Sequence, residues 1–134
     1  MTIEDLKKEI IKLFNTFAVE HPSGHQDNYL NRYIINGSQI CFAFEKSDKV
    51  PAHIWCPLSV DKYVKDVKKR IYDASDLYTK TNTKGEKIYG RHSGIKSTKE
   101  LCDVDLVKFT PATLAEAQKV IEGIKIANRK KSAV

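Results

Sequence analysis

The chain has 134 residues and a mass of 15.3 kDa, which is enough for one compact domain with a sizeable core and too little for a second independent domain. A composition of 41% hydrophobic and 30% charged residues is typical of a globular protein and excludes disordered, collagen-like and disulfide-dense chains. The formal net charge of +6 is compatible with an anionic partner, and equally with plain solubility.

Cysteine usage and the N-terminal sequence favour a cytoplasmic location. Cys41, Cys56 and Cys102 are odd in number and scattered, and they lack the spacing of metal ligands, so we expect structural thiols in a reducing compartment. The first residues have neither the basic start nor the apolar run of a secretion signal. No stretch reaches the roughly 18 apolar residues of a membrane span, so no membrane association is expected.

The first element is predicted to be an amphipathic helix. Thr2 to Asp5 resembles a capping box, and apolar residues then recur at helical spacing: Ile3, Leu6, Ile10, Leu13, Phe14 and Phe17. The following residues 21–28 are polar and aperiodic, which indicates an exposed loop. His21 and His25 are four residues apart, but Pro22 and Gly24 oppose the helix that would align them, and no metal site is predicted.

A meander of three antiparallel strands is predicted next. The strands are expected at residues 32–35, 40–44 and 52–56. Asn36-Gly37 tolerates the positive φ of a type I′ turn between the first two strands, and Pro57 ends the third. Both faces of the second strand are apolar or small, which favours a central position in the sheet.

Residues 59–74 are predicted to form a central helix with a basic face. Ser59 is a candidate N-cap, and one apolar stripe follows: Val60, Tyr63, Val64, Val67, Ile71 and Ala74. The other face carries Lys62, Lys65, Lys68, Lys69 and Arg70.

The rest of the chain completes an α+β pattern. We expect a flexible loop or hairpin tip at 79–86, a short strand at 87–89, a short helix from the capping box 97–100, a strand at 105–109 and a last helix from the capping box 113–116. The prediction is a single α+β domain over residues 1–128, with a mostly antiparallel sheet of about five strands packed against N-terminal, central and C-terminal helices. Residues 129–134 are expected to form a basic, frayed tail.

The positive charge is concentrated in one part of the chain. Residues 62–99 have a net charge of +7, whereas residues 1–61 sum to −2 and residues 100–134 to +1. If the fold brings the basic helix face and the following loops to one side, they would form one electropositive surface. The alternative is that each is an ordinary solvated surface.

The segment from Gly90 to Gly94 has a composition suited to holding an oxyanion. Its glycines free the backbone to turn N–H groups toward a ligand, Arg91 offers a bidentate fork, and Ser93 adds a hydroxyl. His92 is the best candidate for acid/base chemistry, because a neighbouring cation favours its neutral, basic form. The pattern matches neither a P-loop nor a dinucleotide motif, and a plain turn is the alternative.

Two hypotheses follow from these residues. The first is a small binding module for an anionic partner, with nucleic acid as the leading candidate. Phosphates would be contacted by Lys65, Lys69, Lys84, Lys87, Arg91 and Lys96, and Tyr89 or His92 would add stacking or hydrogen bonds. Exposure of both Tyr78 and Tyr89 would favour single-stranded nucleic acid.

The second hypothesis is an enzyme acting on a phosphorylated or carboxylated small molecule, with His92 as acid/base, Arg91 as anion clamp and Ser93 as a further donor. Neither hypothesis requires a cofactor. Protein recognition through a sheet edge or Trp55 is a third possibility, and the sequence predicts no oligomeric state.

Overall fold

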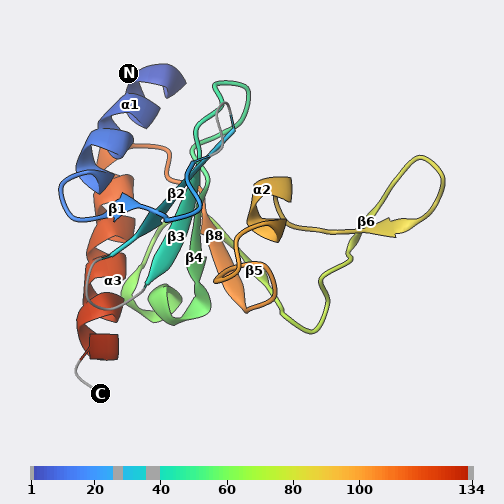
Figure 1. The fold of residues 1–134 in the computed structure, drawn as a ribbon. Helices are drawn as coiled ribbons and strands as arrows, with labels where there is room; N and C mark the ends of the chain where they lie inside the picture. Colours follow the sequence, from blue (N-terminus) through green and yellow to red (C-terminus); the bar gives the residue numbers. More distant parts are fainter. Residues whose placement is uncertain (1, 26–28, 36–39, 133–134) are drawn as a thin grey trace.

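The computed structural model describes residues 2–25, 29–35 and 40–132 and has the predicted α+β architecture. A six-stranded sheet has the order β1-β2-β3-β4-β8-β5, and every neighbouring pair is antiparallel. The long helices α1 and α3 lie on one face of this sheet, and the short α2 lies on the other side (Figure 1). In chain order the elements are α1 (Ile3–Phe14), β1 (Val19–Glu20), β2 (Leu30–Ile34), β3 (Cys41–Glu45), β4 (Ile54–Pro57), the 3₁₀ helix η1 (Leu58–Tyr63), β5 (Lys69–Tyr72), β6 (Lys80–Thr81), β7 (Lys87–Ile88), α2 (Ser93–Lys96), β8 (Leu106–Phe109) and α3 (Leu114–Ser132).

The predicted N-terminal helix is confirmed, together with its cap. The Thr2 hydroxyl accepts a hydrogen bond from the Asp5 N–H at 3.1 Å, which satisfies one of the free donors of the first turn. The helix ends at Phe14, whose ring is fully buried. Its ring centroid lies 4.9 Å from the centroid of the Phe42 ring and 5.1 Å from that of the Tyr33 ring. These rings join α1 to the main core on the helix side of the sheet.

The predicted meander is also confirmed. β2 pairs with β3 and β3 with β4, so β3 is an interior strand that is buried along its whole length. Phe42 and Phe44 belong to the main core, whereas Cys41 and Ala43 belong to a smaller core on the opposite face. The predicted turn at Asn36-Gly37 lies outside the described residues.

The predicted central helix over residues 59–74 is wrong. The chain forms only η1, continues in extended conformation at Val64, passes Asp66 with φ +62°, and then enters β5, which pairs with β8 at the edge of the sheet. Two causes favour this outcome: the segment is rich in β-branched residues, and β8 offers an edge for hydrogen bonding. The sheet gains a strand, and the expected basic helix face does not exist.

A two-stranded arm, β6–β7 with its connecting turn, projects away from the domain on the side of α2 (Figure 1). Within the described residues its strands pair only with each other. The Asn82 side chain organises the turn by accepting hydrogen bonds from the N–H groups of Lys84 and Glu86 at 2.9 and 3.0 Å. Gly85 adopts φ +79°, a conformation that glycine tolerates without strain.

The second, smaller core is covered by α2 and the turns that follow it. Ile95 and Leu101 pack against Trp55 and Leu106 of the sheet. The short helix was predicted to begin with the capping box 97–100, but α2 occupies residues 93–96. The reason is that His92 accepts from the Gly94 N–H at 2.9 Å and caps the chain earlier, while the Thr98 hydroxyl donates back to the Gly94 carbonyl.

The C-terminal helix is confirmed and is longer than predicted. The Thr113 hydroxyl accepts from the Glu116 N–H at 3.1 Å, as its capping box predicts. Helix α3 continues to Ser132, past residue 128, where the basic tail was expected to begin. No helix in the described part of the chain is long and apolar enough to cross a membrane.

Candidate functional site

Arg91 is a buried structural residue, which contradicts its expected role as an anion clamp. Its side chain is only 3% exposed, and its guanidinium donates to the carbonyls of Leu101 at 3.0 Å and Tyr72 at 3.3 Å. These bonds tie the end of β5 to the turn after α2. The guanidinium fork is therefore used inside the protein.

The rest of the Gly90–Gly94 segment does not form an anion cradle. Gly90 packs so closely on Thr79 that an added Cβ would lie 1.8 Å from its hydroxyl oxygen, and the Gly90 N–H donates to the Leu77 carbonyl. The Gly94 N–H is occupied by His92. Close packing on Thr79 at the base of the arm therefore requires glycine at position 90. Ser93 is exposed and is the first residue of α2.

His92 lies beside a buried carboxylate. Its Nε2 is 3.9 Å from one oxygen of Glu45, whose other oxygen accepts a hydrogen bond from the Trp55 indole N–H at 2.7 Å. Burial lowers the pKa of His92, the nearby Glu45 carboxylate raises it, and Lys80 lowers it again. The ring is therefore held in its neutral form at neutral pH.

The neutral ring of His92 has no free basic nitrogen. Nδ1 already accepts from the Gly94 N–H, so the single proton of the neutral ring resides on Nε2 and faces Glu45. A general base needs an unprotonated nitrogen directed at substrate. The geometry thus favours a capping role for His92, and the enzyme hypothesis loses both its base and its clamp.

The lysines expected on one basic surface are divided between the two sides of the sheet. Lys65 lies against α3, where it lines a shallow hollow together with Lys119 and Glu122. Lys69 is on the same side of the sheet as its partner residue Phe109, and its ammonium pairs with Asp61 at 2.6 Å. These two residues are separated from the arm by the sheet itself.

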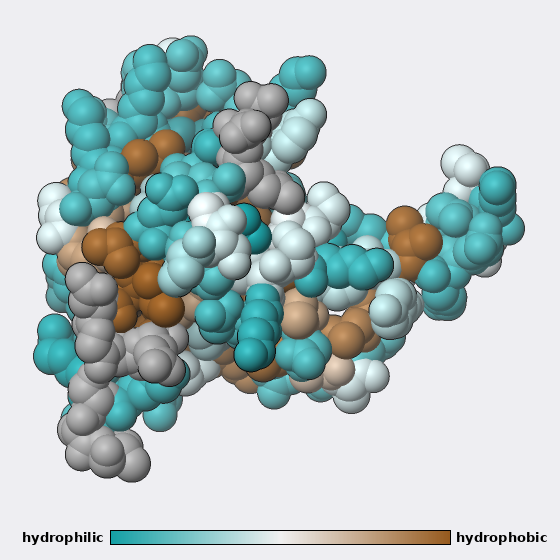
Figure 2. Space-filling view, viewed as in Figure 1, coloured by the Kyte–Doolittle hydropathy of each residue, from teal (hydrophilic) through white to brown (hydrophobic). Residues whose placement is uncertain are grey.

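The remaining predicted cations are on the side of α2. Lys84 and Lys87 are exposed on the β6–β7 arm, and Lys96 is exposed on α2. Lys80, on the other strand of the arm, lies close enough to His92 to lower the pKa of that ring. Figure 2 shows that the surface of the arm is mostly hydrophilic.

The two tyrosines that flank the arm differ in exposure. Tyr78 is 52% exposed, whereas Tyr89 is half-buried and its hydroxyl donates to the Cys102 carbonyl at 2.7 Å. The rings meet edge to face with their centroids 6.3 Å apart. Tyr89 therefore supports the base of the arm, and Tyr78 is the aromatic side chain of this pair that a ligand could reach.

Sequence reasoning missed a row of cations and aromatic rings on the α2 side of the sheet. Arg70, Lys108 and Trp55 are register partners across β5, β8 and β4. The Lys108 ammonium lies 5.3 Å from the centroid of the Trp55 ring and 5.5 Å from the centroid of the Tyr72 ring. The Arg70 guanidinium also lies over the Tyr72 ring. The alternation of Lys68, Arg70 and Tyr72 would have indicated that these residues share one face of a strand. It was missed because the segment was interpreted as a helix.

One cluster in the described residues has metal-ligand types, but its hydrogen bonds do not suit a metal. Ligand atoms of His21, Cys41 and Glu100 lie within 4.8 Å of one another. However, His21 Nδ1 accepts from the Ser23 N–H, so Nε2 carries the proton and donates to Glu100 at 2.8 Å. Burial also raises the pKa of Cys41 to about 12, which disfavours the thiolate that a metal requires.

Comparisons of the chain with protein-family models, with curated proteins and with solved structures gave no match.

Proposed function

We propose that this protein is a binding module for nucleic acid and that the β6–β7 arm is its principal contact element. The observation that carries the proposal is an exposed two-stranded arm that projects from the domain and bears Lys80, Lys84 and Lys87. Its one acidic residue, Glu86, leaves the arm with a net positive charge.

The shape of the arm supports this partner. The major groove of B-DNA is about 12 Å wide and admits a two-stranded β-ribbon. Lysines along such a ribbon can contact the phosphates that border the groove, which provides affinity without sequence specificity. An arm that pairs with no other strand of the described chain has both its edges available for this contact.

The neighbouring surface supplies further cations. Lys96 on α2, together with Arg70 and Lys108 on the sheet, lies on the same side of the sheet as the arm. Lys65, Lys69 and Arg91 are not part of this surface. Because Tyr89 is tied to the Cys102 carbonyl, only one tyrosine of the pair is free to stack on a base, which favours duplex over single-stranded nucleic acid.

The proposal includes a reducing, cytoplasmic location. Its support is that all three cysteines are free, and that Cys41 and Cys56 are buried as small core side chains.

The test measures fluorescence anisotropy of a labelled 20-base-pair duplex, and of one of its strands, over a series of salt concentrations. We expect binding to weaken steeply with salt, and we expect K80E/K84E/K87E to lower affinity and to reduce the salt slope by about 2 to 3. The matched control, K8E/K49E/K119E, makes the same change in net charge at exposed positions away from the arm and should retain the slope.

Two results would contradict the proposal. One is the absence of binding to either probe at low salt. The other is an equal loss in the arm variant and the control variant, because affinity would then depend on net charge and not on the arm. Tighter binding of the single strand than of the duplex would reassign the partner to single-stranded nucleic acid.

A further inference from the structure

A pocket of about 920 Å³ lies at the end of the sheet where η1 meets the last turns of α3. Its residues share nothing with the arm, so an inference about it is independent of the proposed nucleic-acid binding. The volume falls in the range of roughly 300 to 1,000 Å³ that is typical of small-molecule sites.

The floor and walls of the pocket are largely apolar. They include Leu58 of η1, Ala127 of α3, Ile34 of β2 and Val104 of the loop before β8. The Cys41 thiol adds to this surface, and because burial raises its pKa to about 12 it stays protonated and contributes no charge. An apolar ligand body could displace water from these side chains with a gain in free energy.

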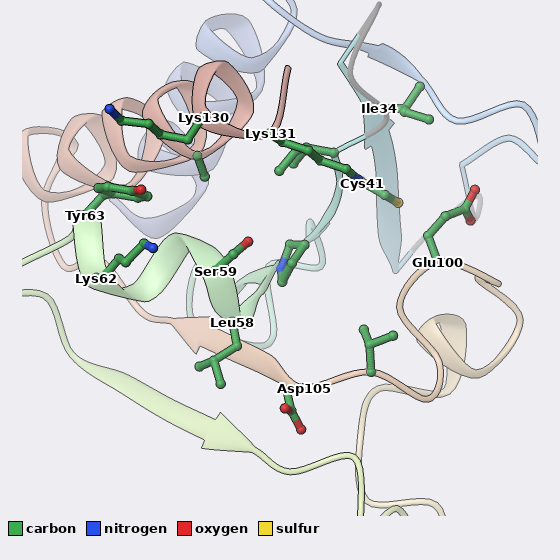
Figure 3. Close-up of a pocket in the computed structure, with 14 residues that line it drawn as sticks. Ile34, Cys41, Leu58, Ser59, Lys62, Tyr63, Glu100, Asp105, Lys130 and Lys131 are labelled. Carbon is green, nitrogen blue, oxygen red and sulfur yellow. The ribbon is translucent and has the colours of Figure 1, made fainter. Parts of the chain in front are cut away.

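Two lysines and a hydroxyl line this pocket from two different elements. Figure 3 shows Lys131 extending from α3 toward Cys41, with the Lys62 ammonium and the Ser59 hydroxyl on η1 facing the space below α3. Lys130 points away along the helix. Among the described residues no carboxylate lies within ion-pair distance of Lys62 or Lys131.

The carboxylates at the rim are already engaged. Glu100 accepts a hydrogen bond from His21 at 2.8 Å, and the Asp105 carboxylate accepts from the Ala74 N–H at 2.7 Å and points away from the pocket in Figure 3. The free carbonyls at the C-terminal end of α3 contribute about half a negative charge. The three consecutive cations of its last turn, Arg129, Lys130 and Lys131, carry more positive charge than that. These hydrogen bonds leave both carboxylates charged, so Lys62, Lys130 and Lys131 against Glu100 and Asp105 give the lining a formal net charge of +1.

We infer that this pocket binds an anionic amphiphile, that is, a carboxylate or phosphate monoester carried on an apolar body. The head group would lie over η1 beside Lys62 and the Ser59 hydroxyl, which can contact its oxygens, and Lys131 would add positive charge from the side of Cys41. The body would lie along Leu58, Ala127 and the opposite wall.

The probes are sodium decanoate and decyl phosphate, with decylammonium chloride as the matched cation. Binding is followed by amide chemical shifts in two-dimensional NMR and by titration calorimetry. Shift changes should concentrate at η1, the end of α3 and residues 100–105. Decanoate or decyl phosphate should bind more tightly than decylammonium, and the tighter of the two anions identifies the head group.

A pair of substitutions at one exposed position tests the role of charge. Ser59→Glu and Ser59→Gln introduce side chains of the same size, and only the first places a negative charge beside Lys62. We expect Ser59→Glu to weaken decanoate binding about tenfold or more relative to Ser59→Gln, because like charges repel. Lys131→Ala should also weaken binding, and Lys49→Ala, at an exposed position outside the pocket, should not.

The inference is overturned if neither anion shifts the pocket amides, if decylammonium binds as tightly as decanoate, or if Ser59→Glu and Ser59→Gln bind decanoate equally. Should Ser59→Glu fail to fold, the comparison of Lys131→Ala with Lys49→Ala gives the same decision. Failure here leaves the arm experiment untouched, because the two sites share no residue.

Discussion

Glu45 on β3 accepts a hydrogen bond from the indole N–H of Trp55 on β4 at 2.7 Å, and Trp55 is only 2% exposed. A buried N–H without a partner costs about 1 to 3 kcal/mol. Glu45→Ala should therefore lower the free energy of unfolding by about 2 kcal/mol, whereas Glu45→Gln, which keeps an acceptor, should cost less. Urea unfolding followed by the fluorescence of Trp55, the single tryptophan, measures both. Equal costs for the two variants would show that this bond contributes little.

Arg91 gives a prediction that separates structure from binding. Arg91→Ala should lower the free energy of unfolding by about 2 kcal/mol, because the carbonyls of Leu101 and Tyr72 lose a charged donor. Its effect on duplex affinity should be less than about twofold, and Lys84→Ala should show the opposite pattern, with unchanged stability and weaker binding. The measurements are urea unfolding and anisotropy on the same samples. A loss of affinity in a fully folded Arg91→Ala protein would restore Arg91 as a contact residue.

Gly123 permits the close packing of α3 on the segment after η1. A Cβ at this position would lie 2.4 Å from a methyl group of Val64. At an exposed helical site a Gly→Ala substitution raises the free energy of unfolding by about 1 kcal/mol. Overpacking of a core lowers it by about 1 to 3 kcal/mol. We therefore expect Gly123→Ala to destabilise the protein, and Val64→Ala to relieve part of that cost in the double variant. A double-mutant cycle by thermal unfolding measures the coupling. Stabilisation by the single variant would contradict the predicted clash.

Three half-buried histidines predict a loss of stability in mild acid. Burial is the main cause that lowers the pKa values of His25, His53 and His92 in the folded protein. The unfolded chain, with a histidine pKa near 6.5, therefore binds more protons, and the free energy of unfolding should fall as the pH drops through about 6.5. Below the folded pKa values it should level off. The lowered pKa of Glu100 affects stability only below about pH 4.5, so measurements from pH 7.5 to 5.5 report on the histidines.

The contribution of one histidine can be isolated. His92→Asn keeps an acceptor for the Gly94 N–H and cannot titrate near neutral pH. The variant should show a smaller fall in unfolding free energy between pH 7.5 and 5.5 than the unmodified protein, as measured by urea unfolding at each pH. An identical fall would mean that the ring of His92 is not held neutral by the fold.

The parts of the fold that were predictable from sequence are those fixed by local interactions. Thr2 and Thr113 bond to N–H groups three residues away, and the meander follows from alternation within each strand. The segment 64–72 could not be predicted in the same way. Its spacing fits a helix, and the decisive hydrogen-bond partner, β8, comes more than thirty residues later in the chain.

The candidate site was predictable only as a charged region. The sequence placed positive charge in residues 62–99 but could not divide it between two faces, because that division depends on β5 being a strand whose neighbours Lys69 and Arg70 point in opposite directions. Arg91 was misassigned because its partners, two backbone carbonyls, are contributed by other segments and leave no mark in sequence.

The arm makes its ladder and turn hydrogen bonds within residues 80–88, and its residues belong to neither core. Its length and sequence can therefore change by substitution or insertion with little effect on the global stability of the domain. Evolution, or an engineer, could alter what the arm recognises while the domain continues to fold in the same way. Selection for recognition and selection for folding would then act on separate sets of residues.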